Sequence, residues 1–141
     1  MIRLSGKKLW TVVLFSTILF HCSHGNIGFA TFYERPYLPT ACAGFDQSIF
    51  PPDNLFAAAG EGIWDNGASC GRLYQVRCIN AERRRACSDP RKIILVRIVD
   101  RAQTSVSRPV RNGAAVVLSV DAFNAIANPQ QDLINVEFIQ R

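Results

Sequence analysis

The sequence predicts an all-β fold: a small, disulfide-tied β-barrel with one or two short helices. Short segments rich in β-branched and aromatic residues recur along the chain and are separated by turn and loop signals. Only residues 121–127 place apolar side chains at helical spacing. Four cysteines outside the first 25 residues can tie the loops together. The length of 141 residues suggests one domain, and no internal repeat is visible.

The first 25 residues have the features of a secretory signal peptide. Three basic residues among the first eight precede an apolar run over 9–20, and Ser23 and Gly25 supply small residues where a signal peptidase cleaves. The run is shorter than the roughly 20 residues that a membrane span needs, so we expect no membrane anchor. We therefore predict that residues 1–25 are removed and that residues 26–141 form the secreted domain.

Cleavage changes the chemistry of the domain. It removes three basic residues and no acidic one, so the formal net charge falls from +5 to +2. We expect no nucleic-acid partner, and Arg83-Arg84-Arg85 is interpreted as a solvated turn. Both histidines, His21 and His24, are also removed. Their loss excludes Ser-His-Asp and Cys-His catalysis and histidine metal sites from the mature domain. We expect neither a cofactor nor a metal.

The mature cysteines predict a disulfide framework. They are Cys42, Cys70, Cys78 and Cys87, an even number in a small secreted domain. Of the three pairings, Cys70–Cys78 would join the two ends of one predicted strand, which disulfide geometry does not permit. We favour Cys42–Cys70 and Cys78–Cys87, worth roughly 3–4 and 2–3 kcal/mol in the chain-entropy model. Zinc binding is the alternative, disfavoured because no Cys-x-x-Cys motif is present.

The first half of the chain predicts one strand, a long loop and a helical turn. Residues 26–33 contain the aromatic residues typical of a strand. The proline-rich segment 34–39 lacks the N–H donors of a central strand, so we expect an extended surface segment. Asp53-Asn54 can cap a short helical turn over residues 55–59.

The second half predicts a series of strands. Asp65-Asn66-Gly67 is a turn signal, and a strand with alternating polar positions follows it. The next strand is nearly continuously apolar, so we expect it to be buried on both faces. In order, the predicted elements are a strand over 72–78, a polar loop over 80–90, the apolar strand over 92–100, a loop over 103–113, a strand over 114–118, the helix over 121–127 with Ser119 as its N-cap, and a strand over 133–139.

Two motifs resemble the first domain of expansins. Ala30-Thr31-Phe32-Tyr33 resembles their Ala-Thr-Phe-Tyr, and the segment 64–71 resembles their Asn-Gly-x-x-Cys-Gly. Closer still is the plant natriuretic peptide group of expansin-like proteins, with matches in order along the mature chain. They include Pro36-Tyr37, Ala41-Cys42, Ser69-Cys70-Gly71-Arg72, Tyr74-x-Val76-Arg77-Cys78-Ile79, Ala86-Cys87, Val99-Asp100, Leu118-Ser119, Ala122-Phe123, Ile126-Ala127 and Asn135-Val136-Glu137-Phe138. The resemblance implies a six-stranded double-psi β-barrel, shared with barwin and family 45 glycoside hydrolases, in the plant cell-wall space.

The sequence departs from the family pattern at two places. No cysteine follows Asp100, so one disulfide of the usual set is missing, and we expect a looser loop over 101–112. Val117 occupies the position before Leu-Ser where the hydrolases and expansins carry an aspartate. Glycoside hydrolysis normally needs two carboxyl groups, one of them a proton donor. Because valine cannot donate a proton, we predict that the protein is not an enzyme and has no catalytic residue.

The resemblance also places candidate ligand residues. Thr31, Tyr33 and Asp100 match groove positions of the expansin domain. For Asp100 the alternative is a loop-entry carboxylate that accepts hydrogen bonds from backbone N–H groups. Trp64 is either a sugar-stacking residue or a core residue beside Cys70.

Resemblance to plant natriuretic peptides implies a hormone-like extracellular factor. Such a factor acts on water and ion balance and on stress responses through a cell-surface receptor, and its activity is associated with the segment matching residues 36–80. Tyr and Arg are typical of interface hot spots, and the candidate partner surface consists of Arg35, Tyr37, Arg72, Tyr74 and Arg77. The alternative is that these residues form an ordinary solvated face without a partner.

Two other functions remain open. The first is a cell-wall polysaccharide-binding or wall-modifying module that uses the barrel groove, and the less favoured second is a barwin-like defence protein. The chain ends at Arg141, directly after the last predicted strand, so we expect none of the carbohydrate-binding second domain that expansins carry. We expect a monomer, because no long amphipathic or heptad surface is visible.

Overall fold

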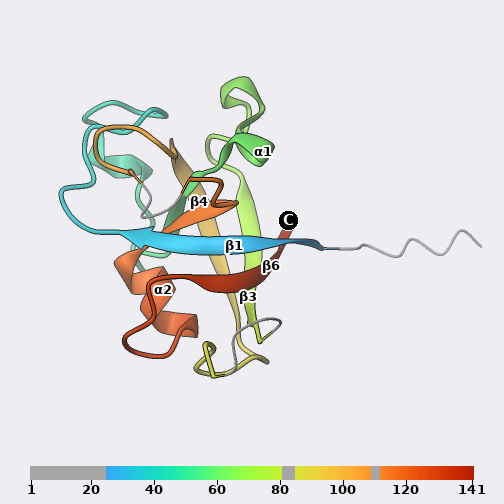
Figure 1. Cartoon of the computed structure of the whole chain (residues 1–141). Coiled ribbons are helices and arrows are strands. Elements are labelled where there is room, and N and C mark those ends of the chain that lie inside the picture. Colours follow the sequence, from blue (N-terminus) through green and yellow to red (C-terminus); the bar gives the residue numbers. More distant parts are fainter. Residues whose placement is uncertain (1–24, 81–84, 109–111) are drawn as a thin grey trace, which may run out of the picture.

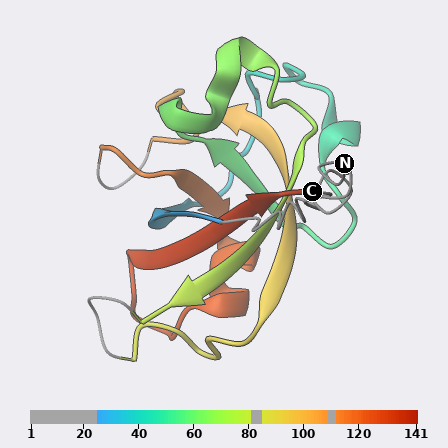
Figure 2. The same cartoon turned by 90° about the vertical axis from the view of Figure 1, so that its right-hand side faces the viewer.

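Six strands form a closed barrel, as predicted (Figures 1 and 2). The computed structural model describes residues 25–80, 85–108 and 112–141. The barrel order is β1-β5-β2-β4-β3-β6. The strands are β1 (Asn26–Tyr33), β2 (Phe56–Ala59), β3 (Leu73–Ile79), β4 (Ile93–Arg101), β5 (Val116–Ser119) and β6 (Ile134–Gln140). Residues 1–24 of the predicted signal peptide and Arg83-Arg84 of the basic turn lie outside the described residues. Within the described residues, no helix has the length and apolar character to cross a membrane.

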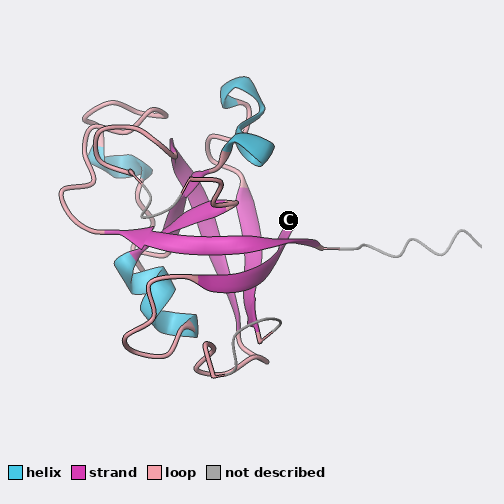
Figure 3. Cartoon of the chain, in the orientation of Figure 1, coloured by secondary structure: helices cyan, strands magenta, loops and turns pink. Residues whose placement is uncertain are grey.

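The barrel mixes parallel and antiparallel pairs. β1 pairs with β5, and β2 with β4, in parallel, whereas the other four pairings are antiparallel. Parallel strands cannot be joined by a two-residue hairpin. The chain therefore crosses the barrel through long connections, and these connections cover part of its outer surface. Figure 3 shows the strands at the centre with the loops and short helices around them.

The helices are short and lie outside the barrel. They are α1 (Glu61–Trp64), α2 (Val120–Ile126) and two 3-10 turns, Gln47–Ile49 and Asp65–Gly67. The predicted helix after Ser119 is present as α2. The Ser119 hydroxyl accepts a hydrogen bond from the backbone N–H of Ala122 at 3.1 Å, as an N-cap does. Ala122, Phe123 and Ile126 form its buried face.

The helical turn predicted over residues 55–59 is wrong: this segment forms β2. Its three alanines favour helix in isolation, and Asp53 does accept the N–H of Leu55 at 3.0 Å. The segment lies between β4 and β5, however, and pairs with both of them. All four side chains of β2 are buried. Small side chains fit where both faces of a strand are covered, and pairing with two neighbours outweighs helix propensity.

The prediction that the apolar strand is buried on both faces holds for only half of β4. Ile93 is 56% exposed and Leu95 is 43% exposed, whereas Val99 and Asp100 are both fully buried. The buried half lies under the connections that follow β1 and β4. Ala41 in the first connection contacts Asp100 by a hydrogen bond, and the guanidinium of Arg97 donates to the carbonyl of Ile49 at 3.2 Å. The outer face of the first half has no such cover.

The side chains form two apolar clusters on opposite faces of the strands. Successive residues of a strand point to opposite faces, so the side chains of Ala30, Leu118 and Ala57 fill the barrel interior. The second cluster lies on the outer face, beneath the connections. It consists of Tyr33, Phe56, Ala58, Val99, Ala102, Ala114 and Val117, with partly buried Phe29, Tyr37, Ile49, Phe50 and Val106 packed against it.

Both predicted disulfides are confirmed. Cys42–Cys70 and Cys78–Cys87 each have a Cα–Cα separation of 5.6 Å, and they close loops with sequence separations of 28 and 9. The first bond ties the connection after β1 to the turn before β3. The second ties the last part of β3 to the segment before β4. Residues 109–111 lie outside the described residues, so the expected loosening of the 101–112 loop stays a prediction.

Gly60 is predicted to be essential for the close approach of β2 to the segment before β5. A Cβ atom there would lie 2.1 Å from the carbonyl oxygen of Ala114, whereas a Cβ at Gly62 would have no heavy atom within 4 Å. Gly60→Ala should therefore lower the free energy of unfolding by about 2 kcal/mol or more. Gly62→Ala, within α1, should leave it unchanged or raise it by up to about 1 kcal/mol. Urea denaturation of both variants measures the difference, and equal effects would contradict the packing described here.

Candidate functional site

Four neighbouring strands bring the candidate groove positions into one row. Thr31 of β1 is the register partner of Val117 in β5, Val117 is the partner of Ala58 in β2, and Ala58 is the partner of Asp100 in β4. Neighbouring strands are about 4.8 Å apart, so Val117 and Asp100 are separated by about 10 Å across the row. The row lies on the outer face of the barrel. We call these four residues the strand row.

The strand row is covered. Thr31, Val117, Ala58 and Asp100 are all fully buried, and Tyr33, two residues beyond Thr31, is 4% exposed. Within the described residues, the hydroxyl oxygens of Thr31 and Tyr33 are buried without a hydrogen-bond partner. The three candidate ligand residues are therefore close to one another but lie beneath the connections. A ligand could reach them only if those connections moved.

The Asp100 carboxylate joins two connections. One oxygen, Oδ1, accepts hydrogen bonds from the backbone N–H groups of Ala41 and Arg101, both at 2.8 Å. The other, Oδ2, accepts one from the Thr104 hydroxyl at 3.1 Å. The Thr104 and Ser107 hydroxyls lie 2.7 Å apart, and Ser107 donates to the carbonyl of Arg101 at 2.6 Å. Asp100 therefore accepts hydrogen bonds from backbone N–H groups at the start of a loop. This is the structural role that the sequence analysis gave as the alternative to ligand binding.

Burial shifts the proton equilibria of this site. Desolvation raises the pKa of Asp100, and the hydrogen bonds from Ala41, Arg101 and Thr104 oppose that shift. Desolvation also raises the pKa of the Tyr33 phenol far above its usual value, with further contributions from the charges of Asp100 and Tyr37. Tyr33 is therefore a neutral group at any physiological pH. Within the described residues, no cluster of three or more His, Cys, Asp or Glu side chains could hold a metal ion.

The candidate partner surface does not form one patch. Tyr74 was expected to be exposed, but it is 3% exposed and packs against Phe138 with ring centroids 6.0 Å apart. This prediction is wrong because residues 74, 76 and 78 of β3 face the interior. Arg72 pairs with Asp65 at 2.7 Å, and Arg77 pairs with Glu137 at 3.1 Å.

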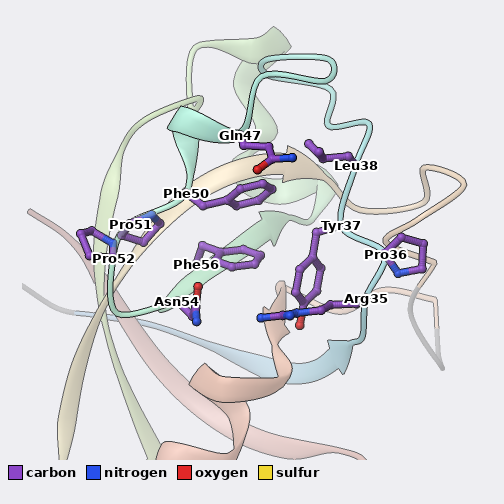
Figure 4. A pocket seen from close by; sticks show the side chains of 10 residues that line it. All are labelled: Arg35, Pro36, Tyr37, Leu38, Gln47, Phe50, Pro51, Pro52, Asn54 and Phe56. Carbon is purple, nitrogen blue, oxygen red and sulfur yellow. The ribbon is translucent and has the colours of Figure 1, made fainter.

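Arg35 and Tyr37 line an open pocket of about 600 Å³ (Figure 4). The residues around it all come from the connection between β1 and β2 and the start of β2: Arg35, Pro36, Tyr37, Leu38, Gln47, Phe50, Pro51, Pro52, Asn54 and Phe56. The sequence analysis identified Arg35 and Tyr37 but none of the other residues that line this pocket. The aromatic and proline content of the segment was the available signal.

Trp64 packs against the core, which is one of the two interpretations that the sequence allowed. Its ring is partly buried against the barrel core. The guanidinium of Arg101 lies over the ring, 5.6 Å from its centroid. That guanidinium also binds both carboxylate oxygens of Glu61, at 2.8 and 3.0 Å. Arg101 therefore covers one face of the indole that a sugar would otherwise stack on.

Comparisons with known proteins agree with this architecture. The family model described as "Lytic transglycolase" matches residues 57–138. An EG45-like domain containing protein from Citrus jambhiri is 35% identical over 137 residues, covering 96% of this chain and 97% of that protein. EG45-like domain containing protein 2 from Arabidopsis thaliana is 33% identical over 140 residues, covering 98% of each chain.

The solved structures show the fold. The expansin of Clavibacter michiganensis, as an apo form and as a mutant in complex with cellohexaose, superposes with a TM-score of 0.58 at 18% identity. The match covers 82% of this chain and 49% of the expansin, so the chain spans about half of that protein. The barrel is therefore of the double-psi type found in expansins.

Replacing Asp100 should change the pH dependence of stability. The folded-state pKa is raised, so the ionised carboxylate weakens the folded state at neutral pH, and this penalty disappears as pH falls below the unfolded-state pKa. The amide oxygen of Asn can still accept from Ala41 and Arg101, and its NH2 can donate to the Thr104 hydroxyl instead of accepting from it, but Asn cannot ionise. The stability of the wild type relative to Asp100→Asn should therefore increase as pH falls from 7 to 3.

Urea denaturation at several pH values measures this difference. Asp132→Asn, at an exposed position, is the matched control. The raised pKa would be contradicted if the unfolding free energy of the wild type minus that of Asp100→Asn stayed constant or decreased toward low pH.

Proposed function

We propose, because this chain belongs to the EG45-like family of expansin-like proteins, that it is a secreted, non-enzymatic protein of the plant cell-wall space. Within that cell-wall setting we assign it the role of a plant natriuretic peptide-like signal. Such a signal acts on water and ion homeostasis and stress response by binding a cell-surface receptor. The protein acts by contact rather than by bond cleavage.

The observation that carries the non-enzymatic part of this proposal is the composition of the strand row. The position for the proton-donating aspartate holds Val117, which is fully buried among apolar side chains. The one carboxylate of the row, Asp100, is committed to three hydrogen bonds within the protein. A hydrolase needs two carboxyl groups that can reach the glycosidic bond. The row supplies one, and it is buried.

The position of the open surface supports the signalling part. The connections cover Thr31, Tyr33 and Asp100, whereas Arg35 is exposed and Tyr37 is half-buried beside the pocket. These two residues lie at the edge of the 36–80 segment that the resemblance associates with signalling. We propose that they contribute to the receptor contact, and that Tyr74, a core residue, does not.

Polysaccharide binding is the second candidate. A Clavibacter michiganensis expansin with the same barrel was solved in complex with cellohexaose. In this second candidate function, a wall polysaccharide would bind on the outer face of the barrel, above the strand row. It requires the connections that cover Asp100 and Tyr33 to move aside.

Binding assays separate the two candidates. The oxidised mature domain, residues 26–141, is incubated with plant membrane preparations and separately with insoluble wall polysaccharides. The signalling proposal predicts saturable binding to membranes that is lost after reduction and alkylation, because the Cys42–Cys70 bond holds the connection that carries Tyr37. Binding to polysaccharide alone would overturn it in favour of the second candidate.

Restoring the missing carboxyl group tests the enzymatic reading. We expect Val117→Asp to release no reducing sugar from cellulose or mixed-linkage glucan, because Asp100 is held by its hydrogen bonds and both positions are covered. Val117→Asn is the matched control, since its amide has a similar shape and cannot act as a general acid. Circular dichroism verifies that both variants are folded. Hydrolysis by the Asp variant alone would show that the row retains the rest of an active site.

A further inference from the structure

We infer that the pocket bounded by Tyr37, Phe50 and Phe56 is a binding site for a small organic anion that carries an apolar or aromatic ring and a carboxylate. This inference goes beyond the proposed function and does not depend on it. We call the site the aromatic pocket. Its volume of about 600 Å³ lies within the range of small-molecule sites.

Three rings form the apolar wall. The centroids of Phe50 and Phe56 are 4.7 Å apart, those of Tyr37 and Phe56 are 4.8 Å apart, and those of Tyr37 and Phe50 are 6.3 Å apart. Phe56 is only 1% exposed and forms the floor, whereas Tyr37 and Phe50 are half-buried at the sides. Figure 4 shows the three rings next to one another, with the other lining residues around them. Aromatic walls of this kind favour a ring that can stack face-on or edge-on against them.

Internal hydrogen bonds fix the wall. The Tyr37 hydroxyl donates to the carbonyl of Tyr33 at 3.2 Å and accepts from the N–H of Val120 at 3.3 Å. It is therefore committed to the protein, and Tyr37 offers its ring. The N–H of Phe50 donates to the carbonyl of Gln47 at 3.3 Å, which fixes the backbone from which that ring projects. A preformed wall reduces the ordering cost of binding a small ligand.

The polar groups at the rim favour an anion. Arg35, Gln47 and Asn54 are the polar side chains of the pocket, and none of its ten residues is acidic. Arg35 takes part in none of the ion pairs found within the described residues. Figure 4 shows Arg35 and Asn54 at one end of the pocket and Gln47 at the other. A guanidinium presents paired donors that match a carboxylate.

The backbone holds Asn54 in position at the rim. Its N–H donates to the carbonyl of Pro51 at 3.0 Å, and its carbonyl accepts from the Ser119 hydroxyl at 2.7 Å. Its φ of 61° is in the left-handed region, which Asn tolerates better than most residues. The side-chain amide is thereby available as a further donor. Apolar walls and a lining that contains one cation and no acidic side chain together favour a ring carboxylate over a neutral or cationic ring; the charges of Glu34 and Asp121 act on Tyr37 from outside that lining.

Matched probes test the charge requirement. Benzoate, trans-cinnamate and the neutral trans-cinnamamide are titrated into the 15N-labelled oxidised domain, and amide chemical shifts are followed by NMR. We expect shifts at Tyr37, Phe50 and Asn54, with a carboxylate bound more tightly than cinnamamide. Arg35→Gln should weaken carboxylate binding about fivefold, a modest factor because the charge is exposed, and leave cinnamamide binding unchanged. Arg91→Gln, whose side chain is 91% exposed and does not line the pocket, is the control.

A second variant tests the wall. Phe50→Ala should weaken all probes about tenfold by removing one ring. The control is Phe45→Ala, because Phe45 is 76% exposed and does not line the pocket. Equal affinities for cinnamate and cinnamamide would overturn the anion assignment. The absence of shifts in the aromatic pocket with all three probes, or shifts confined to another surface, would overturn the site. Because Arg35 is exposed, Arg35→Gln keeps the test decisive even if Phe50→Ala does not fold.

Discussion

The outer face of the barrel depends on the buried carboxylate of Asp100. Its two oxygens accept hydrogen bonds from Ala41 in the connection after β1, from Arg101 at the end of β4 and from Thr104 in the connection that follows β4. A buried carboxylate is unfavourable unless it is hydrogen-bonded, and here three donors compensate for part of its desolvation. The carboxylate also holds the connections that contain Ala41 and Thr104, which are far apart in sequence, over the outer face of the barrel. The Cys42–Cys70 disulfide fixes the same first connection one residue beyond Ala41.

This closure has a direct consequence for function. On this barrel, Thr31, Val117, Ala58 and Asp100 form one continuous row across four strands. With carboxyl side chains at positions 117 and 100, whose strands are about 10 Å apart, an open row could bring two carboxyl groups toward the roughly 6.5–9.5 Å separation of inverting hydrolases. Val117 adds an apolar side chain to the cluster beneath the connections. The same valine thus favours the covered state and, under the proposed function, leaves this position of the row without a proton donor.

The sequence predicted most of the strands and both disulfides because those features leave local signals. The first strand agrees residue for residue with 26–33, and the helix after Ser119 begins one residue earlier than expected. The missed strand, β2, consists of three alanines after Phe56, and its conformation is determined by neighbours that are distant in the sequence. Tyr74 was misplaced because tyrosine suits a surface and a core equally well, and only the register of β3 decides between them. The aromatic pocket was missed because its walls converge only when residues 35–56 fold back on themselves.

Tyr37 connects the closed face with the open pocket. Its ring packs edge-on against Tyr33, in the buried cluster, at 4.9 Å, and against Phe56, at the pocket floor, at 4.8 Å. Its hydroxyl bonds to the backbone at Tyr33 and Val120. The position of this one side chain is therefore set by the closed outer face, while its ring forms part of the pocket wall. If the part of the connection that carries Tyr37 moved away from β2 to open the row, the ring would leave Phe56, and the pocket wall would separate from its floor. A ligand held in the pocket would therefore favour the state in which the connections cover the strand row.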